Sequence, residues 1–205
     1  MGALDGLPWR LKRSIRRLKW DARGRQDPQG AAAFDAQYER GDWAFLENLA
    51  ELAHHSVIAG YCAHVAARSV LDIGCGAGML TPRLRHPELQ SYVGIDFSAA
   101  AIGQAVAAAP SASFEVADAV TYQPARRFDV IVCNEVLYYL DDPLAVVRRY
   151  LDYLEPRGHF IVSVHDRSSQ NGVWTEIGKA LAVRDSVTLT NGDGVSWRVK
   201  LMQPA

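Results

Sequence analysis

The chain has 205 residues, of which 49% are hydrophobic and 22% charged, and its formal net charge at pH 7 is −1. This length is enough for one domain with a sizeable hydrophobic core and is too short for two such domains. The composition excludes a fibrous repeat or a disordered chain. No apolar run approaches the roughly 20 residues that cross a bilayer, and no apolar signal core precedes a cleavage site, so we expect a cytoplasmic protein. The cysteines Cys62, Cys75 and Cys133 lie far apart in apolar surroundings, which predicts buried thiols rather than disulfides or a metal site.

Residues 1–30 are predicted to form a basic arm and a linker ahead of a domain that spans residues 31–205. The first 25 residues hold eight basic side chains against two acidic ones, and residues 9–20 place apolar side chains at helical spacing between the basic ones. Such a helix could lie on an anionic membrane surface or grip a phosphorylated acceptor. It could equally be a solvated arm whose apolar stripe docks on the domain.

The chain from residue 31 onward first shows a helical pattern and then a regular alternation. Residues 31–67 are predicted to form a cap of two or three helices. After Arg68, short β-rich runs alternate with helical stretches, which is typical of a parallel sheet built from βαβ units. The predicted strands span 69–73, 91–96, 113–117, 128–133 and 158–164. The predicted helices between them lie near 79–86, 98–109 and 142–154.

The C-terminal part departs from this alternation. A predicted helix over 173–183 is followed by strands over 186–190 and 195–202, separated by a turn rich in Gly, Asn and Asp. Two such strands form a hairpin, so the final strand should enter the sheet antiparallel. We therefore predict an α/β fold: a Rossmann-like open sheet with mostly parallel strands and an antiparallel last strand, helices on both faces, and an N-terminal helical cap.

The strongest motif is VLDIGCGAG at residues 70–78, where a strand runs directly into a glycine-rich turn. Glycines let the backbone approach a bound molecule closely, and the N–H groups that follow can meet a carboxylate. Asp96 ends the next predicted strand, 20 residues beyond Gly76. A carboxylate there is suited to accept the hydroxyl protons of a ribose. These features indicate a nucleoside cofactor.

The charge beside the glycine turn distinguishes between two such cofactors. A dinucleotide site has no acidic residue before its glycines, because the pyrophosphate is itself anionic. Here Asp72 comes two residues before the first of them, and its carboxylate would repel a phosphate and attract the ammonium group of a methionine moiety. The sequence therefore predicts S-adenosylmethionine rather than NAD.

Further candidate residues follow the other strands. Phe97 offers a flat apolar face to an adenine ring, and Asp118 could accept the protons of its amino group. Asn134 and Glu135 follow the fourth strand, at the edge where open α/β sheets hold ligands.

Five segments, VLDIGCGAG, YVGIDFS, VADA, FDVIVCNEVLYYL and LEPRGHFIVSV, occur in an order and spacing that resemble the class I S-adenosylmethionine-dependent methyltransferases. The likeness is greatest to the small-molecule enzymes related to the nodulation N-methyltransferases, and it covers about residues 35–202. It implies that Asn134 lines the pocket near the sulfonium, and that Tyr38 and Trp43 of the cap close over the cofactor unless they serve ordinary helix packing. The sequence motifs and the resemblance together predict twelve cofactor-binding residues. These are Asp72, Gly74, Cys75, Gly76, Gly78, Asp96, Phe97, Asp118, Ala119, Asn134, Tyr38 and Trp43.

Methyl transfer from a sulfonium is an in-line displacement, so the protein must align the acceptor and remove its proton when the acceptor is a hydroxyl. Candidate general bases are His165 after the fifth strand and Glu135 after the fourth. His165 could instead be a loop histidine bonded to Asp166. His54 and His55 are consecutive on a helix and so face different directions, and we select His55 as the one that reaches the acceptor.

The predicted function is transfer of a methyl group to an O or N atom of a small molecule, such as a sugar, a glycolipid precursor or a secondary metabolite. One alternative is an RNA methyltransferase that uses the basic arm. Nucleic acid is not favoured as a partner, because the rest of the chain is acidic and has no recognisable RNA-binding module. A second alternative is a catalytically silent subunit that binds the cofactor. No metal ligand set is expected, and the sequence makes no prediction of the oligomeric state.

Overall fold

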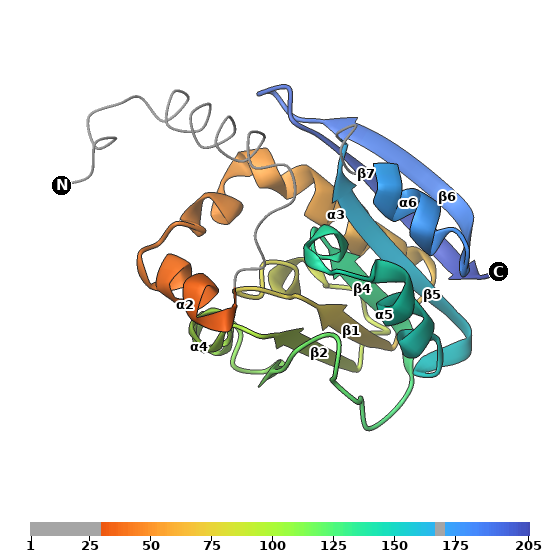
Figure 1. Ribbon diagram of the computed structural model, residues 1–205, viewed down its shortest axis with the longest axis horizontal. Coiled ribbons are helices and arrows are strands. Elements are labelled where there is room, and N and C mark those ends of the chain that lie inside the picture. The colour runs from red at the N-terminus through yellow and green to blue at the C-terminus, as the bar shows by residue number, and fades with distance from the viewer. Residues whose placement is uncertain (1–29, 167–170) are drawn as a thin grey trace.

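The computed structural model describes residues 30–166 and 171–205, so the predicted helix over 9–20 and almost all of the predicted arm and linker lie outside the described residues. The described part contains one seven-stranded sheet in the order β3-β2-β1-β4-β5-β7-β6 (Figure 1). Its strands are β1 Ser69–Ile73, β2 Ser91–Asp96, β3 Ser113–Val116, β4 Phe128–Asn134, β5 Leu154–His165, β6 Leu181–Thr190 and β7 Ser196–Pro204.

The helices that accompany this sheet include three short 3₁₀ turns. The α-helices are α2 Ala31–Glu39, α3 Leu49–His64, α4 Ala99–Ala108, α5 Pro143–Leu151 and α6 Asn171–Ile177. The 3₁₀ turns are Ala44–Glu47, Thr81–Arg83 and Leu137–Tyr139. None of these helices, within the ranges described, is long and apolar enough to cross a membrane.

Each face of the sheet is covered by its own set of helices, because successive side chains of a strand point to opposite faces. One face packs Leu71, Ile131 and Phe160 against α5 and α6. The opposite face packs Val70 and Val132 against α3. In Figure 1, α5 and α6 lie in front of the central strands and α3 lies behind them. The Rossmann-like open sheet with helices on both faces is confirmed.

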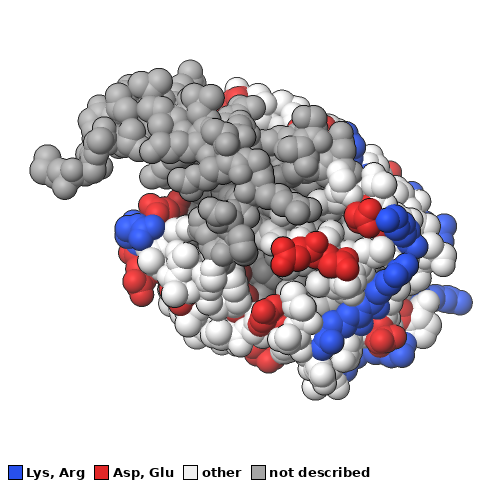
Figure 2. Space-filling view, in the orientation of Figure 1, with Lys and Arg blue, Asp and Glu red and all other residues white. Residues whose placement is uncertain are grey.

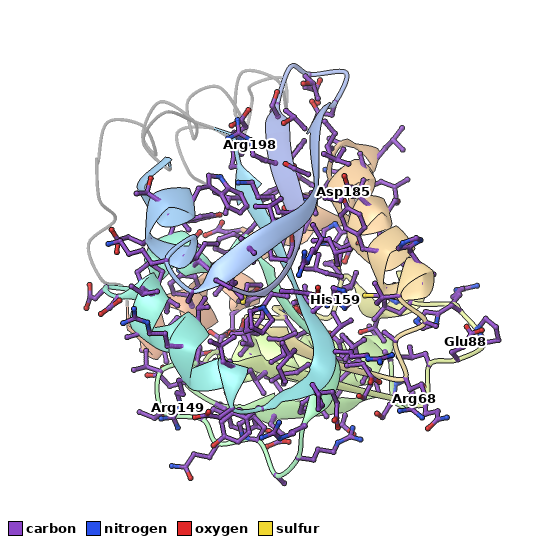
Figure 3. All side chains as sticks on the ribbon, turned by 90° about the vertical axis from the view of Figure 1, so that its right-hand side faces the viewer. Arg68, Glu88, Arg149, His159, Asp185 and Arg198 are labelled. Atoms are coloured by element: carbon purple, nitrogen blue, oxygen red, sulfur yellow. The ribbon has the colours of Figure 1, made fainter. Side chains whose placement is uncertain are left out.

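The C-terminal hairpin enters the sheet as expected. Strand β7 lies between β5 and β6 and is antiparallel to both, whereas the neighbouring strands from β3 to β5 pair in parallel. Tyr61 of α3 donates a hydrogen bond to Asp185 of β6 over 2.7 Å, and Figure 3 shows Asp185 on the side of β6 that faces this helix. The edge strand is therefore fastened to the same helix that covers the inner strands.

Several predicted boundaries are wrong, and the structure shows why. The helix expected near 79–86 is only the 3₁₀ turn Thr81–Arg83, because Pro82 and Pro87 restrict the segment and Leu84 takes a non-helical ψ of 77°. Helices α5 and α6 end earlier than predicted. Strands β5 and β6 begin earlier, because residues assigned to helices by their apolar content pair with β4 and β7 instead.

The predicted cap is helical, but its parts have different positions. Helix α2 ends before Gly41, which has a φ of +71°, and α2 lies beside α4 (Figure 1). Helix α3 covers the sheet and contributes the fully buried side chains of Ile58 and Cys62 to the core. Within residues 31–67, α2 therefore lies beside α4 at the edge of the sheet, whereas α3 lies over its face. All three cysteines are buried and free, as predicted.

Candidate functional site

The glycine loop leaves β1 in a conformation that requires glycine. The φ values of Gly74, Gly76 and Gly78 are +69°, +55° and +77°. A Cβ on Gly74 would lie 2.6 Å from Cγ2 of Val136, and one on Gly76 would lie 2.6 Å from the Tyr38 hydroxyl. The loop is also fixed to the neighbouring strand, since the N–H groups of Gly74 and Cys75 both donate to the carbonyl of Ile95. It is therefore a rigid backbone cradle.

Asp72 lies beneath this loop with only half of its carboxylate satisfied. The side chain is 2% exposed, and its Oδ2 accepts a 2.7 Å hydrogen bond from the Tyr92 hydroxyl. Its Oδ1 is buried and has no partner among the described residues. Burial raises the pKa of Asp72 to about 7, with a smaller contribution from the Asp96 charge, while the Tyr92 hydrogen bond opposes the rise. A buried acceptor without a donor is costly, so this oxygen is suited to an incoming ammonium group.

Asp96 connects the glycine loop to the start of α4. Its Oδ2 accepts from the Gly76 N–H at 3.0 Å, and its Oδ1 accepts from the Ser98 N–H at 2.9 Å. Burial raises the pKa of this carboxyl, and the two backbone donors partly offset the rise. The carboxylate therefore stands beside the loop with lone pairs left for ribose hydroxyl groups.

A second carboxylate attaches helix α2 to the same segment. The Ser98 hydroxyl donates to Oδ1 of Asp35 over 2.6 Å, and the Ala100 N–H donates to the same oxygen over 3.0 Å. Ser98 thus contacts Asp96 through its backbone and Asp35 through its side chain. The position of α2 is tied to the loop that would hold the ribose.

Replacing Asp35 with alanine is expected to release α2 and to weaken S-adenosylmethionine binding about two- to fivefold, because the α2 attachment loses two hydrogen bonds. Hydrogen exchange should become faster over Ala31–Glu39 and stay unchanged in β1. Asp42→Ala is the matched control, since Asp42 pairs with Arg40 on the surface of the same cap. Equal exchange in the two variants would contradict this role for Asp35.

An aromatic cluster lies between α2 and the carboxyl ends of the strands. The ring centroid of Phe34 lies 4.9 Å from that of Phe97, 5.9 Å from that of Trp43 and 5.8 Å from that of Tyr139. Tyr38 stacks on Trp43 at 5.7 Å. The predicted residues Tyr38, Trp43 and Phe97 are therefore brought together. Phe34 was not predicted as a site residue, although it stands four residues before Tyr38 on the same helix and so shares its face.

A cavity of about 230 Å³ adjoins this cluster. Its lining combines the cap with the glycine loop and α4, and includes Tyr38, Trp43, Ala77, Met79 and Gln104. The indole nitrogen of Trp43 is buried and has no hydrogen-bond partner in the part of the chain that the structure describes.

Asp118 and Ala119 follow β3 at the same edge of the sheet. The N–H of Ala117 donates to the carbonyl of Asp96, which places this turn next to the end of β2. The Asp118 side chain is exposed and accepts from the Val120 N–H at 2.7 Å, and the Ala119 carbonyl accepts from the Tyr150 hydroxyl. Contact of Asp118 and Ala119 with adenine stays a prediction.

Glu135 leaves β4 with a φ of +57°, which is rare for a residue that is not glycine. Its Oε1 accepts from the Ser163 hydroxyl, and its Oε2 accepts from the Tyr138 hydroxyl and from the backbone N–H of His165, each at 3.1 Å. Loss of solvent raises the pKa of Glu135 to about 7, although these three donors act in the opposite direction. The strained backbone and the three donors hold one carboxyl group at the end of β4.

The remaining predicted residues meet next to Glu135. Asn134 donates from Nδ2 to Nε2 of His55 over 3.2 Å, which brings α3 and β4 together. The ring of His165 lies 5.7 Å from that of Trp197, which in turn stacks on His54 at 4.8 Å. Both His54 and His55 are buried, and their rings are in contact, so the two histidines diverge less than their adjacent positions suggested.

The partners of these residues were not predicted from the sequence, because α3 and β7 reach them only through the tertiary fold. They are Glu51, His54, Tyr138, Ser163 and Trp197. Among the residues described there is no group of three or more His, Cys, Asp or Glu side chains that could hold a metal ion.

This strand order, with a glycine cradle at the end of β1 and a carboxylate at the end of β2, defines the class of α/β proteins that bind nucleoside cofactors. The sequence profile of the methyltransferase domain family matches residues 32–199, and the chain belongs to that family.

The chain is also similar to several individual methyltransferases. It is 35% identical over 107 residues to trans-aconitate 2-methyltransferase from Methylobacterium radiotolerans, covering 51% of this chain and 41% of that protein. It is 30% identical over 129 residues to the ubiquinone biosynthesis O-methyltransferase of Paraburkholderia phytofirmans, covering 60% and 55% respectively. The chain thus spans about half the length of the curated relatives it matches.

The fold is similar to that of a solved structure over most of both chains. The N-methyltransferase NodS from Bradyrhizobium japonicum WM9, in complex with S-adenosyl-L-homocysteine, matches with a TM-score of 0.67 and 24% identity, covering 80% of this chain and 92% of NodS.

Proposed function

We propose that this protein transfers a methyl group from S-adenosylmethionine to an oxygen or nitrogen atom of a small molecule. The observation that carries the proposal is the buried carboxylate of Asp72, which has one unpaired oxygen directly beneath a cradle of glycines with positive φ. The matched relatives are named as a trans-aconitate methyltransferase and a ubiquinone biosynthesis O-methyltransferase, and NodS as an N-methyltransferase, which supports the same chemistry here.

The residues present fit such a cofactor. Asp72 and the glycine loop would hold the amino-acid end, since the loop offers backbone and Asp72 offers negative charge. Asp96 would accept the ribose hydroxyls, and the aromatic cluster around Phe97 would flank the adenine. Bound S-adenosylmethionine supplies a methyl group that its sulfonium charge has already activated.

The chain's own contribution to the reaction would be alignment of the acceptor and removal of its proton. Glu135 suits the second task, because a carboxyl whose pKa is raised to about 7 can take up a proton near neutral pH. His165 would take part through its backbone N–H, which donates to Glu135, and its ring is a second candidate base. His55 would act through Asn134 rather than directly, since its Nε2 already accepts from that amide.

The two alternative functions receive less support. Figure 2 shows Lys and Arg side chains on the α5 side of the visible face, with acidic groups between them. The described part of this face therefore lacks the continuous positive charge that favours binding of the phosphate backbone of a nucleic acid. A silent cofactor-binding subunit is distinguished from an enzyme only by turnover.

Isothermal titration calorimetry tests the cofactor, and release of S-adenosylhomocysteine in the presence of amines and phenols tests the transfer. We expect saturable binding of S-adenosylmethionine and no binding of NADH. Tight binding of NADH, with none of S-adenosylmethionine, would disprove the proposal. Binding without turnover for any acceptor in the panel would favour the silent subunit.

Asp96→Asn is expected to weaken S-adenosylmethionine binding about 10- to 100-fold, because a charge-assisted hydrogen bond to the ribose contributes roughly 1.5–3 kcal/mol. Asp152→Asn is the matched control, since Asp152 is exposed at the end of α5. Unchanged affinity of the Asp96 variant by calorimetry would refute its assignment to the ribose.

A further inference from the structure

Three groups form a hydrogen-bonded chain from α3 to the end of β4. Nδ1 of His55 lies 2.9 Å from the backbone carbonyl oxygen of Glu51, and Nε2 of His55 lies 3.2 Å from Nδ2 of Asn134. The ring of His55 is 3% exposed, so neither nitrogen is free to exchange its partner for water.

The hydrogen bond at Nδ1 of His55 determines the direction of the hydrogen bond at its Nε2. A carbonyl oxygen only accepts, so Nδ1 of His55 must carry the proton that bonds to Glu51. Burial lowers the pKa of His55 to about 4, and the Arg83 charge adds to this, while the bond to the Glu51 carbonyl opposes it. The ring is therefore neutral at pH 7, its Nε2 has a lone pair, and the amide of Asn134 must turn its NH₂ group toward it.

This orientation turns the other end of the amide away from His55. Oδ1 of Asn134 is buried and has no hydrogen-bond partner among residues 30–166 and 171–205. Asn134 ends β4 beside β1, whose Ile73 pairs with Cys133, so the next residues along the two chains, Gly74 and Asn134, are neighbours. Asn134 also points to the same sheet face as Asp72, because Asp72 pairs with Val132, two residues before Asn134 on the same strand. A buried acceptor without a donor thus belongs to a residue that lies beside the glycine loop and directly precedes Glu135.

We propose that His55 is a positioning residue, which holds the Asn134 amide so that its oxygen accepts a hydrogen bond from the attacking N–H group of the acceptor. This inference rests on the proposed methyl transfer and adds the class of acceptor. The favoured acceptor is a primary amine or a primary amide, because one N–H can bond to Asn134 while the nitrogen gives its other proton to Glu135 as the new N–C bond forms and the C–S bond breaks. A hydroxyl has one proton, which cannot bond to the amide oxygen and pass to Glu135 at once. A carboxylate has no such hydrogen, and its charge would meet the amide oxygen and the nearby Glu135 carboxyl.

The cationic side chain of Arg83 bears on the class of acceptor. Arg83 lies close enough for its charge to lower the pKa values of both His54 and His55, and its Nε is buried without a hydrogen-bond partner in the described chain. Its Nη1 donates to the carbonyl of Met79, which keeps the guanidinium on the 3₁₀ turn. A carboxylate acceptor would need Arg83 to turn toward Asn134. Methyl transfer to a carboxylate would therefore directly contradict the proposed class of acceptor.

The first experiment reads the tautomer of His55 by ¹⁵N–¹H correlation NMR of the imidazole rings in the ligand-free protein. We expect His55 to be neutral at pH 7 with its proton on Nδ1, and the signal to be assigned by its loss in His55→Gln. His64, exposed at the end of α3, is the internal reference for a solvated ring. A proton on Nε2 of His55 would overturn the proposal, because the Asn134 amide would then have to face the other way.

The second experiment compares two ligands by calorimetry. Sinefungin carries an amine where S-adenosylmethionine carries the transferred methyl, and S-adenosylhomocysteine has no donor there. The wild-type protein should prefer sinefungin about tenfold, as expected for one charge-assisted hydrogen bond. His55→Phe should reduce this preference to near one, and His55→Gln should retain it, since a glutamine oxygen can accept from Asn134. The affinity for S-adenosylhomocysteine should be the same in all three proteins.

The outcomes distinguish failure of the positioning role from failure of the proposed function. If S-adenosylhomocysteine does not bind the wild-type protein, the proposed function fails. If it binds equally well in all three proteins and His55→Phe keeps the full preference for sinefungin, the positioning role fails alone. Incubation with S-adenosylmethionine and trans-aconitate should release no S-adenosylhomocysteine above background, and release would overturn the acceptor class.

Discussion

Asp72→Asn is expected to weaken S-adenosylmethionine binding at least about 100-fold at pH 8, because it leaves the cofactor's ammonium group buried without its counter-charge. The amide oxygen can keep the bond from the Tyr92 hydroxyl, so the packing around residue 72 is preserved. Calorimetry at pH 8 measures the loss. In the wild-type protein the affinity should also fall as the pH decreases below about 7, where Asp72 takes up a proton.

The same substitution should stabilise the ligand-free protein. The pKa of Asp72 is about 7 in the folded chain against 3.8 as its ordinary value, so the folded state favours the neutral carboxyl. This favourable contribution is complete below pH 3.8 and is lost as the pH rises through 7. Asparagine stays neutral, so the variant should gain about 2–4 kcal/mol at pH 8 and nothing at pH 4. Thermal unfolding at both pH values is the measurement, with Asp118→Asn at an exposed position as control. An equal change at the two pH values would exclude desolvation of Asp72 as the cause.

Gly74→Ala is expected to destabilise the protein by about 2–4 kcal/mol, the sum of left-handed backbone strain and overpacking. The φ of +69° disfavours any Cβ, and this one would meet Cγ2 of Val136 at 2.6 Å. The midpoint of thermal unfolding should fall by about 5–15 °C.

Gly103→Ala provides a control of opposite sign. Gly103 lies inside α4, and a Cβ added there would meet nothing within 4 Å, so alanine should stabilise the helix by about 0.5–1 kcal/mol. If both variants unfold at the wild-type temperature, the loop does not have the rigidity that we assign to it.

The sequence predicted the parts of this fold that depend on local pattern. The strands at 69–73 and 91–96 were predicted to the residue, because each is a short apolar run bounded by turn residues. The glycine loop and Asp96 were predicted for a similar reason, since their spacing along the chain is itself the signal. The helix near 79–86 failed because its apolar content suggested a helix while two prolines prevented it.

The region that we propose for the acceptor was harder to predict. His55 and Asn134 are 79 residues apart, and their contact depends on the way α3 packs across the sheet. Trp197 reaches His54 only because β7 re-enters the sheet antiparallel. No spacing rule along the chain describes such contacts, so the sequence could propose His55, His165 and Glu135 separately but not the network that joins them.

The antiparallel entry of β7 also divides the edge of the sheet into two regions of different origin. The start of β7 lies beside the end of β5, where His165 pairs with Trp197, and Asn191 in the preceding turn donates to the carbonyl of Ala50 in α3. The wall next to the histidines is thus built by the last fifteen residues of the chain, whereas the cofactor loop comes from its middle. Changes in the length or sequence of the β6–β7 turn can therefore reshape the region around the histidines while Gly74, Gly76 and Asp96 keep their places. Under the proposed function, a domain built this way could exchange one methyl acceptor for another without rebuilding the site for the donor.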